Sequence, residues 1–340
     1  MADRLSLGEV GEHSFLNQLC ARLRPRASAA RGILLGPGDD CAVLDTKPWP
    51  LAVTTDALVS GVHFEPGWLS CAELGGRAAA VNLSDLAAMG ARPAFMLIAV
   101  TAPPATPAAD LEQLLDGFTA RSEAEGAAVV GGNLSRARSL SVTVTALGWI
   151  DGPCLTRSGA RPGDRLAVTG TLGGAAAAVA SWLGGSEPAP ELRERFVDPR
   201  PRVAAGRALA RAGAHAAIDV SDGLLQDLGH LCSASGVGAV VERERLPRLA
   251  PVAALDAQGS DLAATGGEDY ELLVALPPSS GAEIEQLAGD AGVPLTLIGE
   301  CVAPSAGVKL IAADGSVYHT RAGGGFDHFR GPAPPRSSGG

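Results

Sequence analysis

CAELGGRAAAVNLSDLAAMG, residues 71–90, decides the fold, because its apolar residues recur with helical spacing and Gly90 supplies a stop signal. The preceding stretch PLAVTTDALV (50–59) is apolar and β-branched, which predicts a strand. After the helix, FMLIAVTAP (95–103) predicts a second strand and DLEQLLDGFTARSEAEG (110–126) predicts an amphipathic helix. Strands therefore alternate with helices, which indicates an α/β or α+β unit.

Two further predicted strands, AAVVGG (127–132) and SLSVTVTALGWI (139–150), complete the first half. The next stretch, DGPCLTRSGARPGD (151–164), has the Gly, Pro and Asp content of a connection. A chain of 340 residues also exceeds the usual size of one hydrophobic core. We therefore expect an N-terminal α/β domain over residues 1–150 and a C-terminal α/β domain over residues 151–330.

The second half repeats the alternation of strands and helices. The predicted strands lie at 165–170, 216–220, 238–242, 270–277 and 294–299, and the predicted helices at 173–184, 201–213, 223–235 and 281–292. The last residues, 331–340, are rich in Pro, Ser and Gly, have little to bury, and are expected to be disordered.

Composition excludes several classes of protein. A net charge of −10 and a pI near 5.1 argue against nucleic-acid binding, which depends on clustered Lys and Arg. No apolar run approaches the roughly 20 residues that span a bilayer, and the start lacks the pattern of a signal peptide, so we expect no membrane association and a cytoplasmic location. The six cysteines form no CxxC pair, which argues against a zinc ribbon.

Short polar clusters, most of them acidic, stand beside glycines or hydroxyl residues throughout the chain. They are GPGDD (36–40), TTD (54–56), NLSD (82–85), VGGN (130–133), IDVSD (218–222), GGEDYE (266–271) and GFDH (325–328). An acidic protein that gathers more acids into turns must neutralise them, and hard divalent cations with phosphate ligands do this readily. The clusters favour magnesium-nucleotide chemistry, although each one alone also fits an ordinary turn.

Some of these acids are not explained as simple turn residues. Asn82 and Asp85 lie at i and i+3 on a helix face that is otherwise apolar, and a buried acid needs a partner, so a metal is a candidate. Ser221 and Asp222 precede a predicted helix and could be simple N-caps. Asp219 lies inside a predicted strand, where capping does not explain it.

The familiar phosphate-binding loops are missing from the sequence. There is no GxxxxGK[ST], and TGTLGGAAAA (169–178) lacks the spacing of a GxGxxG fingerprint. Phosphate would therefore be held by metals and arginine. Arg157 in the connection is the best-placed cation, with a solvated linker arginine as the alternative.

Taken together, GDDCAVL, TTDALVSGVHF, AVNLSDLAAMGARP, LTRSGARPGD, IDVSDGLLQDLGH, GGEDYEL and GFDHF resemble the thiamine-monophosphate kinase family of the aminoimidazole ribonucleotide synthetase superfamily. The resemblance spans roughly residues 7–329. It implies an N-terminal ATP- and magnesium-binding domain whose sheet pairs with that of a second subunit in a homodimer. It further implies direct transfer of the γ-phosphoryl of ATP to thiamine monophosphate, with several Mg²⁺ ions and no phosphoenzyme.

Carried over position by position, the resemblance assigns three groups of residues. The magnesium ligands are Asp40, Thr54, Thr55, Asp56, Asp85, Asp219 and Asp222. The nucleotide contacts are Gly132, Arg157 and Ser221, and the contacts to thiamine monophosphate are His63 and Glu268.

Two positions depart from the family pattern. Asn133 stands where the family commonly has Asp; its amide oxygen still suits Mg²⁺ and ATP but brings no charge. Near the C-terminus the chain is glycine-rich, which leaves Phe326 as the candidate to stack on the thiamine rings. The alternatives are another ATP-dependent enzyme of the same superfamily and a non-catalytic nucleotide-binding paralogue.

Overall fold

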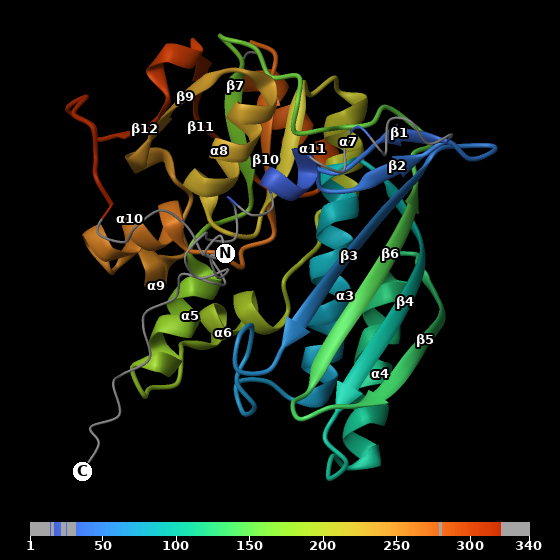
Figure 1. Ribbon diagram of the computed structural model, residues 1–340. Helices are drawn as coiled ribbons and strands as arrows, with labels where there is room; N and C mark the ends of the chain where they lie inside the picture. Colours follow the sequence, from blue (N-terminus) through green and yellow to red (C-terminus); the bar gives the residue numbers. More distant parts are fainter. Residues whose placement is uncertain (1–13, 15–16, 22–24, 26–31, 279–280, 321–340) are drawn as a thin grey trace, which may run out of the picture.

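The computed structural model describes residues 14, 17–21, 25, 32–278 and 281–320 (Figure 1). The predicted stacking residue Phe326 and the predicted tail at 331–340 lie outside the described residues. None of the helices in the described part of the chain combines the length and the apolar character that a membrane span requires.

A six-stranded sheet forms the first half. In spatial order its strands are β1 (Ile33–Leu35), β2 (Ala42–Leu44), β3 (Leu51–Val59), β6 (Ser141–Trp149), β4 (Arg92–Ala102) and β5 (Ala128–Arg136). Two helices, α3 (Cys71–Ala88) and α4 (Ala108–Ala124), pack against one face of this sheet (Figure 1). The opposite face carries partly exposed apolar side chains, including Phe95 and Leu97 of β4, each 38% exposed.

The packing of α3 on α4 depends on two glycines at their crossing. A Cβ atom on Gly75 would lie 1.9 Å from the Leu114 carbonyl oxygen, and one on Gly117 would lie 2.0 Å from the Ala72 carbonyl oxygen. Neither position can accept a larger residue without separating the helices. The start of α3 is fixed by a capping box, in which Ser70 and Glu73 bond each other's backbone amides.

A second six-stranded sheet forms the other half. In spatial order its strands are β12 (Val308–Ile311), β9 (Gly238–Glu242), β11 (Leu295–Val302), β7 (Arg165–Thr169), β10 (Glu271–Leu276) and β8 (Ala216–Val220). Its helices are α5 (Gly174–Leu183), α6 (Pro190–Val197), α7 (Val203–Arg211), α8 (Leu224–Ser235), α9 (Ala250–Ala253), α10 (Asp256–Thr265) and α11 (Gly281–Ala291), with short 3₁₀ turns at Arg243–Arg245 and Pro304–Ala306. Strand β12 runs parallel to β9, whereas the other neighbours are antiparallel.

Helix α3 joins the two halves, because it contacts α7 and β8 as well as its own sheet. The core of the first half also takes in Phe196 of α6 and Tyr270, which come from the second half of the chain. The two-sheet α/β prediction is confirmed. Sequence reasoning missed α6, α9, α10 and β12, which are short or weakly periodic.

Candidate active site

Three carboxylates from distant parts of the chain meet where α3 contacts β8. Asp40 precedes β2, Asp85 lies in the last turns of α3, and Asp219 lies in β8. One oxygen of each lies within 4.8 Å of the others; Asp40 and Asp219 are buried and Asp85 is partly buried. The structure therefore brings together three of the predicted magnesium ligands.

The charges in this cluster are poorly compensated by protein groups. Desolvation, followed by the nearby Asp219 and Asp40, raises the pKa of Asp85 well above its usual value. Desolvation and Asp40 likewise raise the pKa of Asp219 to about 7. Hydroxyl groups oppose these shifts: Thr54 Oγ1 donates to Asp85 at 2.6 Å and Ser84 Oγ donates to Asp219 at 2.7 Å. A bound cation would favour the ionised form of all three acids.

Arg157 neutralises one side of the cluster. Its Nη2 donates to Asp40 Oδ1 at 2.5 Å, and its backbone amide donates to Asp39 at 3.1 Å. The other oxygen of Asp40, Oδ2, is buried and has no hydrogen-bond partner in the described part of the chain. An orphaned carboxylate oxygen beside two more carboxylates fits a hard divalent cation such as Mg²⁺, which prefers oxygen ligands.

Strand β3 divides its predicted ligands between two faces. The Thr54 side chain points toward Asp85 on α3, and the backbone amide of Asp56 donates to Asn82 Oδ1 at 3.0 Å. Thr55 points to the opposite face, where its Oγ1 donates to the Val144 carbonyl oxygen at 2.7 Å. The Thr55 side chain is thus directed away from the carboxylates, which leaves its backbone carbonyl as the group that it can offer.

The N-cap interpretation of Ser221 and Asp222 is wrong. Helix α8 begins at Leu224 with Gly223 as its N-cap. The backbone amides of Ser221, Asp222 and Gly223 each donate to Asp227 Oδ2 at 3.1 Å. The buried Asp227 thus caps the turn from inside the helix, whereas Ser221 and Asp222 line the adjoining pocket and Asp222 Oδ2 accepts from Gln226 Nε2 at 3.1 Å. Sequence reasoning missed Asp227, which reads as an ordinary helical residue.

A cleft of about 650 Å³ adjoins this turn and collects five of the predicted site residues. They are Asp56, His63, Ser221, Asp222 and Glu268. The rest of its wall includes apolar and aromatic side chains, among them Trp68, Phe196 and Tyr270. We call this cleft the acidic pocket.

Sequence reasoning missed these aromatic residues, since it considered only Phe326. The ring of Trp68 stacks on Trp182 with 4.9 Å between centroids, and Phe196 meets both rings edge-on. Their scattered positions carry no local motif, so no sequence pattern could have placed them on one wall.

Gly132 and Asn133 lie elsewhere, on edge strand β5. Gly132 pairs with Ile98, Ile98 with Val144, and Val144 with Asp56. Three strand spacings correspond to about 14 Å. Within one chain the structure therefore does not bring Asn133 to the carboxylate cluster, although the sequence predicted it as a ligand to the same metals.

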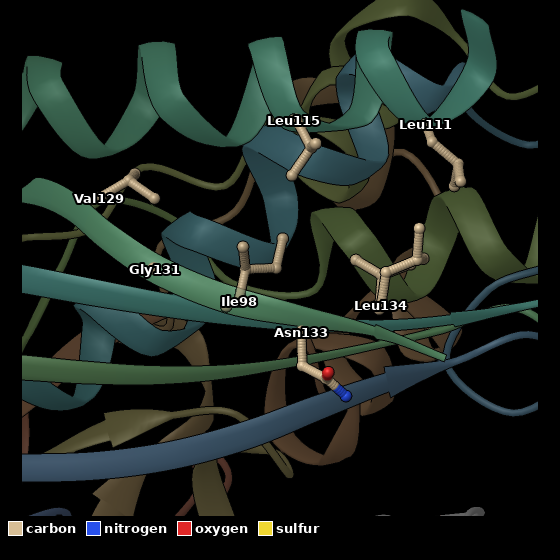
Figure 2. Close-up of a pocket in the computed structure, with 9 residues that line it drawn as sticks. Ile98, Leu111, Leu115, Val129, Gly131, Asn133 and Leu134 are labelled. Atoms are coloured by element: carbon tan, nitrogen blue, oxygen red, sulfur yellow. The ribbon is translucent and has the colours of Figure 1, made fainter. Parts of the chain in front are cut away.

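The helix-covered side of β5 borders an apolar pocket of about 340 Å³ (Figure 2). Leu111 and Leu115 of α4 form its roof, while the Asn133 side chain points away from α4 (Figure 2). Gly132 is required here because a Cβ atom would lie 2.0 Å from the Ile98 carbonyl oxygen. We call this hollow the β5 pocket.

Comparison with known proteins identifies both halves. Residues 38–150 match the model of the AIR synthase related protein N-terminal domain, and residues 161–310 match that of the C-terminal domain. The thiamine-monophosphate kinase of Salmonella typhimurium is 40% identical over 331 residues, which cover 95% of this chain and 99% of the relative. That of Mycobacterium tuberculosis H37Rv is 41% identical over 274 residues, which cover 79% and 81%.

A solved structure extends the similarity to three dimensions. The structure described as AaThiL complexed with AMPPCP and TMP superimposes with a TM-score of 0.81 at 28% identity. The match covers 96% of this chain and all of that one. The fold described above is thus shared with a protein that binds both of those ligands.

Proposed function

The chain belongs to the thiamine-monophosphate kinase family of AIR synthase related proteins, and we propose from this that it transfers the γ-phosphoryl of ATP to thiamine monophosphate. The products are thiamine diphosphate and ADP. The observation that carries the proposal is the carboxylate cluster of Asp40, Asp85 and Asp219 beside the acidic pocket, because phosphoryl transfer between two anions needs concentrated positive charge.

Mg²⁺ is the cation that these residues suit best. Asp40, Asp85 and Asp219 would hold it, with Asp56, Asp222 and the oxygens of Thr54 and Thr55 completing further sites. When bound, Mg²⁺ neutralises the phosphate oxygens and so permits the two substrates to approach.

The protein's own groups act by alignment. Arg157, held against Asp40, is placed to contact a phosphate at the edge of the cluster, and the Ser221 hydroxyl is a further contact. His63 and Glu268 face the acidic pocket, where we place thiamine monophosphate. A loose transition state makes positioning and charge neutralisation sufficient, so direct in-line transfer needs no covalent intermediate on the protein.

We place the nucleobase of ATP in the β5 pocket, with Gly132 and Asn133 at its edge. The apolar lining suits a flat heterocycle, which supports this assignment. The distance from Asn133 to the cluster of the same chain supports a homodimer, in which the open faces of two N-terminal sheets meet and one subunit completes the site of the other. Phe95 and Leu97 on that face supply apolar surface for such an interface.

The enzyme is expected to work in the cytoplasm, where its co-substrate ATP is made. The two domains are expected to divide near residue 150, the first holding ATP and magnesium. One specific observation favours the second candidate, a nucleotide-binding paralogue without turnover: Asn133 brings no charge at a position where, by the resemblance, the family commonly has Asp.

One assay separates the two functions. Purified protein is incubated with ATP, MgCl₂ and thiamine monophosphate, with thiamine or no acceptor in parallel, and the products are quantified by chromatography. Equal amounts of thiamine diphosphate and ADP, formed from the monophosphate alone, are expected. ATP binding without product would reject the kinase and favour the paralogue.

A further inference from the structure

Arg77 is the largest fully buried side chain of the protein's described part, and it lies outside the carboxylate cluster. It belongs to α3, two turns before Asp85, and its exposed fraction is 0%. A buried arginine is costly unless it is paired and hydrogen-bonded. The residues that pair with the Arg77 guanidinium therefore indicate what this buried charge does.

The guanidinium of Arg77 is held by Glu268, a charged residue of the acidic pocket. Nη2 donates to Glu268 Oε2, and Nη1 donates to the backbone carbonyl oxygen of Phe196 in α6. The guanidinium carbon lies 4.0 Å from the centroid of the Phe196 ring and 5.8 Å from that of Tyr270. Arg77 is thus fixed by two aromatic rings and aims its charge at one carboxylate.

Tyr270 holds the same carboxylate from a second direction. Its hydroxyl donates to Glu268 Oε2 at 3.0 Å. The backbone around this pair is strained, because Glu268 has φ = 74° and Tyr270 has φ = 50°. Two hydrogen bonds keep it in place: the Glu268 amide donates to the Ser221 carbonyl oxygen at 2.7 Å, and the Tyr270 amide donates to that of Val220 at 2.8 Å.

These hydrogen bonds link the acidic pocket to the carboxylate cluster. Glu268 is 28% exposed at the pocket, whereas Arg77 and Tyr270 stand behind it in the protein. The same strained turn is bonded to the end of β8, which carries Asp219 and leads into Ser221 and Asp222. Helix α3 therefore contacts both parts of the site: its Arg77 holds Glu268 of the acidic pocket, and its Asp85 belongs to the carboxylate cluster.

We propose that Arg77 and Tyr270 are positioning residues for thiamine monophosphate, which act by fixing the Glu268 carboxylate in the acidic pocket. The inference rests on the proposed function, since it assigns Glu268 to the acceptor. Arg77 contributes charge balance behind the pocket wall, and Tyr270 restricts the rotation of the carboxylate about its final bond.

Steady-state kinetics of Arg77→Met, Arg77→Lys, Tyr270→Phe, Glu268→Gln and the double variant R77M/E268Q test this proposal. Losing a hydrogen bond to a charged group predicts a rise in the KM for thiamine monophosphate of about ten- to hundredfold in R77M. The KM for ATP is expected to stay within about twofold, because neither Arg77 nor its partners Glu268 and Phe196 line the β5 pocket, where we place the nucleobase. Arg77→Lys should recover part of the loss, and in the double variant R77M should add little to E268Q.

The controls separate positioning from folding. Arg211→Met, an exposed arginine of α7, should leave both KM values unchanged, and melting temperatures report on the fold of every variant. If R77M does not fold, the KM for thiamine monophosphate is measured in R77K and Y270F instead. An unchanged value in both variants overturns the proposal. Equal losses for ATP and acceptor, or multiplicative losses in the double variant, also overturn it.

The parent enzyme is assayed first. If it makes no thiamine diphosphate, the proposed function fails and the role of Arg77 falls with it. If the parent turns over and only the prediction for the variants fails, the positioning role alone is rejected.

Discussion

Thr54 of β3 donates a hydrogen bond of 2.6 Å to Asp85 of α3, although 31 residues separate them along the chain. This bond joins the central strand of the first sheet to the helix that carries one third of the carboxylate cluster. It also opposes the desolvation that raises the pKa of Asp85. The hydrogen bond therefore helps to hold the Asp85 carboxylate inside the protein, beside Asp40 and Asp219.

Asp85→Asn is expected to stabilise the metal-free protein and to weaken its response to Mg²⁺. An acid whose pKa is raised on folding costs stability once the pH exceeds its unfolded value, so removing the charge relieves repulsion at pH 7. The same change removes a metal ligand. Thermal unfolding with and without MgCl₂ measures both effects.

The control for that experiment is Asp116→Asn, which removes an exposed acid of α4. It should change neither the melting temperature nor the Mg²⁺ response. A full Mg²⁺-induced shift in Asp85→Asn would exclude this residue from the metal site.

Asn133→Asp is expected to lower the Mg²⁺ concentration for half-maximal activity, because a carboxylate supplies the charge that the amide lacks. The expected change is several-fold, with the KM for thiamine monophosphate unaffected. Activity titrated with MgCl₂ at saturating ATP measures it. Gln113→Glu, the same amide-to-acid change at an exposed position of α4, is the matched control; an equal change there would indicate a general charge effect.

Leu97→Lys is expected to separate the subunits of the proposed homodimer. The side chain is 38% exposed on the open face of the first sheet, where a charge would oppose burial against a second copy. Light scattering coupled to size exclusion should report a monomer for Leu97→Lys and a dimer for the parent. A parent that is itself monomeric would refute the proposed assembly.

Loss of activity should accompany that dissociation if Asn133 and Gly132 complete the partner's site. Leu255→Lys is the control, because Leu255 is 40% exposed but precedes α10 in the second half, away from the first sheet and from both pockets. A fully active monomer would place the nucleotide contacts within one chain.

Glu73 is expected to stabilise the junction of α3 and α6 in a pH-dependent way. The pKa of Glu73 is lowered from 4.5 to about 2, and the largest cause is the hydrogen bonding from the Arg193 side chain. A depressed acid pKa contributes stability above the unfolded value, and that contribution is lost as the pH falls toward the folded value. Glu73→Gln should therefore lower the free energy of unfolding at pH 6, and the difference should shrink between about pH 4.5 and pH 2.

Urea unfolding across that pH range measures the effect, with Glu112→Gln as an exposed control on α4. A difference between Glu73→Gln and the parent that stays constant down to pH 2 would show that the Arg193 pair does not depress this pKa.

Local pattern was enough to determine the two α/β halves. The helix at 71–90 and the strands at 216–220 and 238–242 could be predicted from the spacing of apolar residues and from β-branched content. Both signals involve only residues that are close together in the sequence. The acidic clusters and their order along the chain also identified the family. These features depend on short-range chemistry, so they can be read without a structure.

Tertiary structure alone decided which of these residues meet. Asp219 lies 135 positions from Ser84, its hydrogen-bond partner, and no local signal encodes such a contact. The packing of the strands also places Asn133 on an edge strand, away from the carboxylates. It brings the backbone amide of Asp222 to Asp227 and the buried Arg77 to Glu268. Long-range contacts follow from how helices and sheets pack, because burial and close approach are properties of the whole fold.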